Sequence, residues 1–163
     1  MGHKLPVKKQ LSPYCCREIT YSRKVQQAPE EDSSPALDEK WVLWVKRIFG
    51  ALLYYARAVN NKLLVSLSAI GEQQASVTVK TRNAINQILD YCATYPDDGI
   101  VYRSSDIILN AHSDVGFNNE TKSRSRAGAH IFLSENEPIP RWNGPILTIV
   151  QMMKYVLSSA AES

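Results

Sequence analysis

The stretch IILNAHSDVGF, residues 107–117, is an apolar run that ends in a carboxylate, a glycine and an aromatic residue. At the two-residue period of a β-strand, Asn110 and His112 share a face with Asp114, which is expected at the far end of the strand. A carboxylate where a buried strand opens into a loop is a common way to offer an oxygen ligand to Mg²⁺. Aspartate and glycine are also ordinary turn residues, so the spacing alone leaves both interpretations open.

Three further strand candidates surround this run, separated by polar loops. They cover residues 100–102, 129–133 and 139 to about 149. The first is joined to the 107–117 run by four polar residues and is expected to form a hairpin with it. Pro138 and Pro140 indicate that the last strand begins at an edge or after a bend. Past Val150 the apolar residues fall at helical spacing, which predicts a C-terminal helix.

Helical spacing predicts three helices before the strands. A long amphipathic helix begins after Asp38, which can cap its first turn, and ends at Asn60-Asn61. A shorter helix over 63–70 ends at Gly71, and a third covers about 77–94. The first helix carries five aromatic residues that are expected in the core: Trp41, Trp44, Phe49, Tyr54 and Tyr55.

Residues 95–98 spell Tyr-Pro-Asp-Asp, which matches the Tyr-x-Asp-Asp signature of reverse transcriptases. In those enzymes the two aspartates occupy a hairpin between apolar strands and hold metal ions. Here a helical period precedes the motif, Pro96 removes a ladder donor and Gly99 closes a turn. We therefore interpret the motif as a helix stop and a turn.

The composition is that of a globular protein, with 44% apolar and 21% charged residues among 163. The net charge of +3 does not by itself indicate a nucleic-acid binder. We expect no contact with membranes, because there is no membrane-spanning apolar run and no signal-peptide core. Cys15, Cys16 and Cys92 lack partners at metal-ligand spacing, so an intracellular protein with reduced thiols is expected, in cytoplasm or nucleus.

Cationic residues gather in two places. The N-terminal segment, rich in Lys, Arg, Ser and Pro, shows no periodicity and is expected to be a flexible arm. The loop over 118–128 carries Lys122, Arg124 and Arg126, which could contact phosphates. A solvated loop is the ordinary alternative.

These patterns predict an α+β chain, in which a helical layer is followed by an antiparallel or mixed sheet of about four strands and a C-terminal helix. The expected domains are a flexible arm over 1–37, a helical segment over 38–96 and the sheet over 97–163.

Several segments resemble the C-terminal part of the Pol polyprotein of copia-type LTR retrotransposons. IFGALLYYARAV, residues 48–59, looks like the "VGSLLYLA" helix that closes the reverse transcriptase region, and INQILDYCATYPDDGIVY is similar to the connection that follows. HSDVGF resembles the "YSDADW" that opens the ribonuclease H (RNase H) domain, and SRSRAGAHIFLSE, residues 123–135, resembles its second strand. IPRWN resembles the third strand, and SSAAES the start of the first helix. The resemblance covers nearly everything from Asp38 onward, in the family's order.

The resemblance implies an incomplete RNase H-like fold and a two-metal mechanism, in which carboxylates hold two Mg²⁺ ions and RNA is cut in an RNA/DNA hybrid. Asp114 matches the first metal-binding carboxylate. With one extra alanine allowed, Glu162 matches the earlier glutamate of the family's Glu-Ala-Glu run, so the catalytic one would lie one residue past Ser163. The family's remaining aspartates belong to strands that this sequence lacks, and one carboxylate cannot usefully hold two hydrated Mg²⁺ ions.

The sequence thus predicts a truncated Pol fragment that is catalytically inactive alone and does not bind the family's Mg²⁺ productively. One alternative is a weak, sequence-independent nucleic-acid-binding module that uses Lys122, Arg124, Arg126 and the arm. Another is a subunit completed by another chain, because an unfinished sheet leaves an open edge that favours self-association. If the chain end is artificial, cleavage of RNA in RNA/DNA hybrids is expected.

Overall fold

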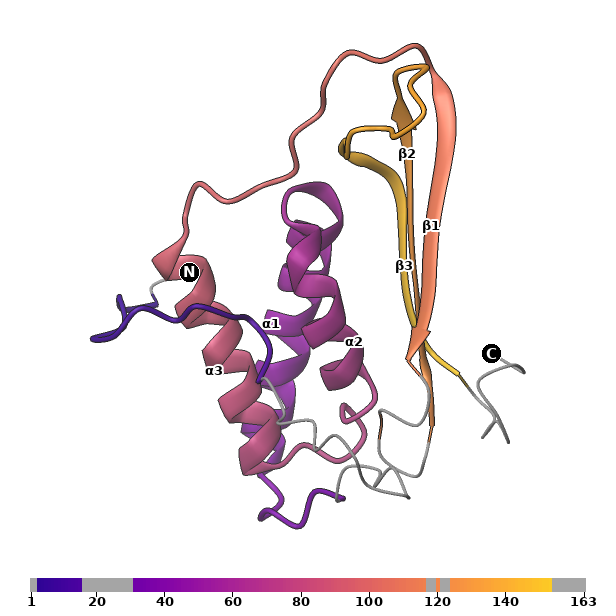
Figure 1. Cartoon of the computed structure of the whole chain (residues 1–163). Helices are drawn as coiled ribbons and strands as arrows, with labels where there is room; N and C mark the ends of the chain where they lie inside the picture. Colours follow the sequence, from indigo (N-terminus) through magenta and orange to yellow (C-terminus); the bar gives the residue numbers. More distant parts are fainter. Residues whose placement is uncertain (1–2, 16–30, 117–119, 121–123, 154–163) are drawn as a thin grey trace, which may run out of the picture. The chain divides into compact units, whose positions relative to one another are not determined.

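The structure is a computed structural model that describes residues 3–15, 31–116, 120 and 124–153. The chain divides into two compact units (Figure 1). The helical unit comprises Met1–Ile19 and Asp32–Gly99, and the strand unit comprises Thr20–Glu31 and Ile100–Ser163. The described part contains three α-helices and three antiparallel strands, which confirms the predicted α+β class. None of the described helices is both long and apolar enough to cross a membrane.

The helical unit contains the three helices that the apolar spacing predicted. Helix α1, Glu39–Ala58, begins at Asp38, whose carboxylate accepts a hydrogen bond from the Trp41 amide at 3.1 Å. A 3-10 turn, η1 (Asn61–Leu63), leads into α2, Leu64–Gly71. Helix α3, Val79–Thr94, is capped by Thr78 and ends before the turn at Pro96.

Aliphatic side chains from all three helices form the core of this unit. Those with no exposed surface are Val45, Ala56, Leu63, Leu67, Ile85 and Ile88. The aromatic residues of α1 were predicted as core, but Tyr54 is 78% exposed, and the buried residues of this helix are Val45, Leu52 and Ala56. That prediction is therefore wrong for Tyr54, because the buried stripe of α1 is aliphatic.

The described residues 3–15 form hydrogen bonds with α2 and α3. The Gln10 amide donates to Thr94 Oγ1 at 3.1 Å, and Gln87 Nε2 donates to the Ser12 carbonyl at 3.1 Å. Ser66 on α2 also donates to the main chain of this segment. These residues belong to the range predicted as a flexible arm, and here helix side chains satisfy some of their backbone groups.

The strand unit contains an antiparallel sheet in the order β1-β2-β3. Its strands are β1 (Ile108–Gly116), β2 (Arg126–Ser134) and β3 (Pro145–Met152). The strands predicted within 107–117 and over 129–133 are confirmed, while β3 begins later than predicted and continues to Met152. The predicted C-terminal helix lies outside the described residues, apart from its first positions, which belong to β3.

Two predictions about the sheet are wrong. Residues 100–102 form no strand, so the expected hairpin is absent and the described sheet has three strands instead of about four. This segment contacts the start of β3 and the loop before it: the Tyr102 hydroxyl donates to the Pro145 carbonyl at 3.1 Å. At the next residue, the Asn143 side chain accepts from the Arg103 amide at 2.7 Å and donates to the Arg103 carbonyl at 3.0 Å. A side-chain amide thus replaces the backbone partner that a strand would need. Close packing accompanies it, because a Cβ at Gly144 would lie 2.6 Å from the Tyr102 ring.

The sheet has two faces of different character. The aromatic face carries His112 on β1 with His130 and Phe132 on β2, and Trp142 packs on Phe132 with ring centroids 5.4 Å apart. The aliphatic face carries these residues: Leu109, Ala111, Ala129, Ile131, Leu133, Leu147 and Ile149. Strand β1 was predicted to be buried, but most of its residues are exposed.

Candidate functional site

Asp114 lies on the aromatic face of β1, with Asn110 and His112, as the alternation predicted. It is paired with Gly128 on β2, and β1 continues for two more residues to Gly116, so Asp114 lies within the strand and not at its opening into a loop. The side chain is exposed, and its Oδ1 accepts a hydrogen bond from the Val115 amide at 2.8 Å.

The three cations predicted to contact phosphates differ in their surroundings. Arg126 is 8% exposed, and its Nε lies 2.7 Å from Oε1 of Glu120, whose side chain is buried as well. Its positive charge is therefore matched inside the protein and is not presented to a phosphate. Arg124 is partly exposed, and its carbonyl accepts from the Glu120 amide at 3.0 Å. Lys122 lies outside the described residues.

The described residues around Asp114 offer few ligands to a two-magnesium centre. Each ion needs several oxygen ligands. Across the β1–β2 pair the facing residue is Gly128, and the same-face neighbours along β1 are His112 and Gly116. Within the described ranges, no three His, Cys, Asp or Glu side chains are placed to hold a metal ion. Glu162, the other predicted catalytic residue, lies outside those ranges.

Next to Asp114 the aromatic face holds a cluster that sequence reasoning did not identify. His112 and His130 face each other across β1 and β2, and the Trp142 ring lies 4.5 Å and 5.2 Å from their ring centroids. His130 Nε2 is 3.2 Å from the Asn143 carbonyl. The alternation placed both imidazoles on defined faces, but nothing in the sequence indicated that Trp142 turns back onto them.

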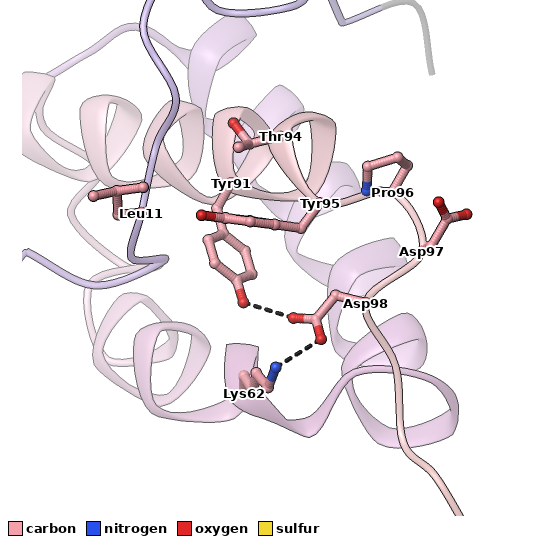
Figure 2. Close-up of a pocket in the computed structure, with 8 residues that line it drawn as sticks. All are labelled: Leu11, Lys62, Tyr91, Thr94, Tyr95, Pro96, Asp97 and Asp98. Carbon is pink, nitrogen blue, oxygen red and sulfur yellow. Dashed lines mark hydrogen bonds and ion pairs between the residues drawn. The ribbon is translucent and has the colours of Figure 1, made fainter.

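The helical unit has a polar site of its own at Asp98, within the Tyr-Pro-Asp-Asp motif (Figure 2). Its carboxylate accepts from Lys62 Nζ at 2.6 Å and from the Tyr91 hydroxyl at 2.7 Å. Asn60 donates to it at 3.3 Å. Asp97 points away in Figure 2 and is exposed, so the two aspartates do not converge. These contacts confirm a helix stop and turn, and they show a clamp that the sequence did not reveal.

The Asp98 clamp lines an open hollow and shifts two pKa values. The lining residues are Leu11, Lys62, Tyr91, Thr94, Tyr95, Pro96, Asp97 and Asp98. The hydrogen bond from Lys62 holds the pKa of Asp98 below its usual value. Burial, then the hydrogen bond to Asp98, raise the pKa of Tyr91 to about 12. At neutral pH the site therefore contains an anion, its paired cation and a protonated phenol, which suits structural stabilisation.

Alkaline pH is expected to destabilise the helical unit through Tyr91. A pKa raised from about 10 in the unfolded chain favours the protonated phenol in the folded state, so its stabilisation is complete below pH 10 and is lost as the pH rises towards 12. The loss should reach about 2–3 kcal/mol, measured by urea unfolding followed by circular dichroism.

The Tyr91→Phe variant isolates this effect from lysine titration in the same pH range. It should be less stable than the wild type at pH 8, and it should lose less stability between pH 10 and 12. Tyr54→Phe, at an exposed hydroxyl, is the matched control and should follow the wild type. Equal alkaline losses in all three proteins would contradict the assignment.

Comparisons with sequence families, with curated proteins and with solved structures found no match to this chain. The resemblance to the copia-type Pol polyprotein therefore stays a prediction from the sequence segments.

Proposed function

We propose that the strand unit is the opening sheet of an RNase H-like domain derived from a copia-type Pol polyprotein, and that it does not cleave nucleic acid by itself. Strand order and register support the proposal. Asp114 lies on the first strand, β2 falls within residues 123–135 expected for the second, and β3 follows antiparallel. The proposal assigns α1 to the end of the reverse transcriptase region, because it contains residues 48–59.

The observation that carries the proposed inactivity is the chemistry of the positions around Asp114. Its facing residue is Gly128, and the diagonal positions on β2 hold Arg126 and His130. None of these three can give a carboxylate oxygen to a cation shared with Asp114. No catalytic step through Mg²⁺ is derived for this site, because one exposed carboxylate does not position two ions.

A hybrid-cleavage assay tests this proposal. The purified full chain with Mg²⁺ is expected to cut the labelled RNA of an RNA/DNA hybrid no faster than buffer does, and Asp114→Asn should not differ from it. Asp106→Asn is the matched control, since Asp106 lies in the same unit and accepts from the Asn136 amide at 2.9 Å. Magnesium-dependent cleavage that persists in Asp106→Asn and disappears in Asp114→Asn would overturn the proposal.

Of the two alternatives, we propose a subunit completed by another chain. Arg126 is paired with Glu120 and is therefore not available to a phosphate, which weakens the nucleic-acid-binding alternative. Pairing with another chain is supported by the exposure of β1 at the edge of the sheet. We therefore propose strand pairing at β1 as the second candidate function.

A further inference from the structure

We infer that the free edge of β1 binds a second copy of this chain, with the two β1 strands antiparallel and centred on Ser113. The inference rests on the second candidate function and names its partner. It is independent of whether the chain cleaves nucleic acid.

Strand β1 offers a free edge. Among the described residues it pairs only with β2, and six of its nine residues are exposed. The outer side of an edge strand presents backbone N–H and C=O groups that another strand can bind. In this sheet both β1 and β3 are edge strands.

The β3 edge carries two features that disfavour strand addition. Strand β3 begins with Pro145, and the β2–β3 register shifts between Ile131 and Phe132. Proline and irregular pairing both disfavour strand addition. Strand β1 has no proline and no lysine, and Asp114 is its single formally charged residue. The β1 edge is therefore the one open to a partner.

Charge selects the register of the pair. If Ser113 faces Ser113 of the second copy, each His112 faces Asp114 of the other copy on the aromatic face. An imidazole N–H can then donate to a carboxylate twice across the two-fold axis. On the aliphatic face Ala111 faces Val115 of the second copy, so small side chains meet at the centre.

The neighbouring registers are less favourable. A shift by two residues in one direction places the two Asp114 carboxylates opposite each other, which like-charge repulsion disfavours. The same shift in the other direction places His112 opposite His112 and leaves Asp114 facing Asn110. A shift by one residue joins the aromatic face of one copy to the aliphatic face of the other.

Disulfide trapping in the full chain tests the pairing. In the inferred register, a Ser113→Cys variant places the two new thiols directly opposite each other, with Cβ atoms about 4.5–5.5 Å apart. That separation is near disulfide reach, so mild oxidation should form a covalent dimer through residue 113. Ala111→Cys is the matched control, because Ala111 is exposed as well but its two copies lie about 13 Å apart along the strands.

The expected result is about tenfold more covalent dimer through the new cysteine in Ser113→Cys than in Ala111→Cys. Peptide mass spectrometry identifies the linked residue, since Cys15, Cys16 and Cys92 are present in both variants. Sedimentation of the wild-type chain should show a dimer that dissociates on dilution. A monomer at every concentration overturns the inference. So does a dimer in which Ala111→Cys links as well as Ser113→Cys, or in which neither links. The hybrid-cleavage assay tests separately whether the chain cleaves nucleic acid.

Discussion

Replacing Phe132 with alanine is expected to lower the free energy of unfolding of the strand unit by about 3–5 kcal/mol. Phe132 has no exposed surface, and its ring centroid lies 5.7 Å from that of His112, 5.3 Å from that of His130 and 5.4 Å from that of Trp142. Truncation removes the side chain at the centre of this cluster and leaves a cavity, because the surrounding rings are held by the sheet and by the loop before β3.

Hydrogen exchange of β2 amides, followed by mass spectrometry across a urea series, measures this loss within the strand unit alone. Leu109→Ala is the matched control, since Leu109 is 64% exposed on the aliphatic face, and its effect should stay within about 0.5 kcal/mol. Similar losses in both variants would show that Phe132 is not the centre of this unit's packing.

Replacing Glu120 with alanine is expected to cost about 3–5 kcal/mol in the strand unit. The side chains of Glu120 and Arg126 are 9% and 7% exposed, so the substitution removes the Glu120 carboxylate from a buried guanidinium. The same exchange measurement applies, and the exposed Glu137→Ala serves as control, with a change within about 0.5 kcal/mol.

A double variant separates loss of the pair from loss of one partner. Glu120→Leu with Arg126→Met replaces both charges by apolar side chains, and such a replacement is often neutral or stabilising. It should therefore recover most of the stability lost in Glu120→Ala. If the double variant is as unstable as the single one, the ion pair is not the cause of the loss.

The fold could be predicted from the sequence where local chemistry determines it. Asp38 caps the first turn of α1, and Pro96 follows the end of α3. Both signals therefore lie within a few residues of the helix boundaries that they set. Alternation along residues 107–114 placed Asp114 on the correct face of β1. Residues 100–102 could not be predicted, because this segment and the adjacent Arg103 contact residues about forty positions away, Pro145 and Asn143.

The position of Asp114 on β1 could be predicted from the sequence, but the partners of the candidate side chains could not. Arg126 was expected on an exposed loop. Its side chain is instead buried beside Glu120, six residues earlier in the chain. In the clamp, Asp98 contacts Lys62, 36 positions earlier in the chain, and Asn60, 38 positions earlier. No local sequence pattern reaches that far. Helical spacing gives the direction of a side chain, but it does not give its partner on another element.

The clamp at Asp98 also explains how four letters of a polymerase signature arise in a chain whose local structure differs from a polymerase hairpin. Here proline ends α3, and the second aspartate ties Lys62 and Tyr91 together. In this chain the four residues end a helix and hold an ion pair and a phenol. Ancestry should therefore not be inferred from a four-residue motif unless the backbone around it is known.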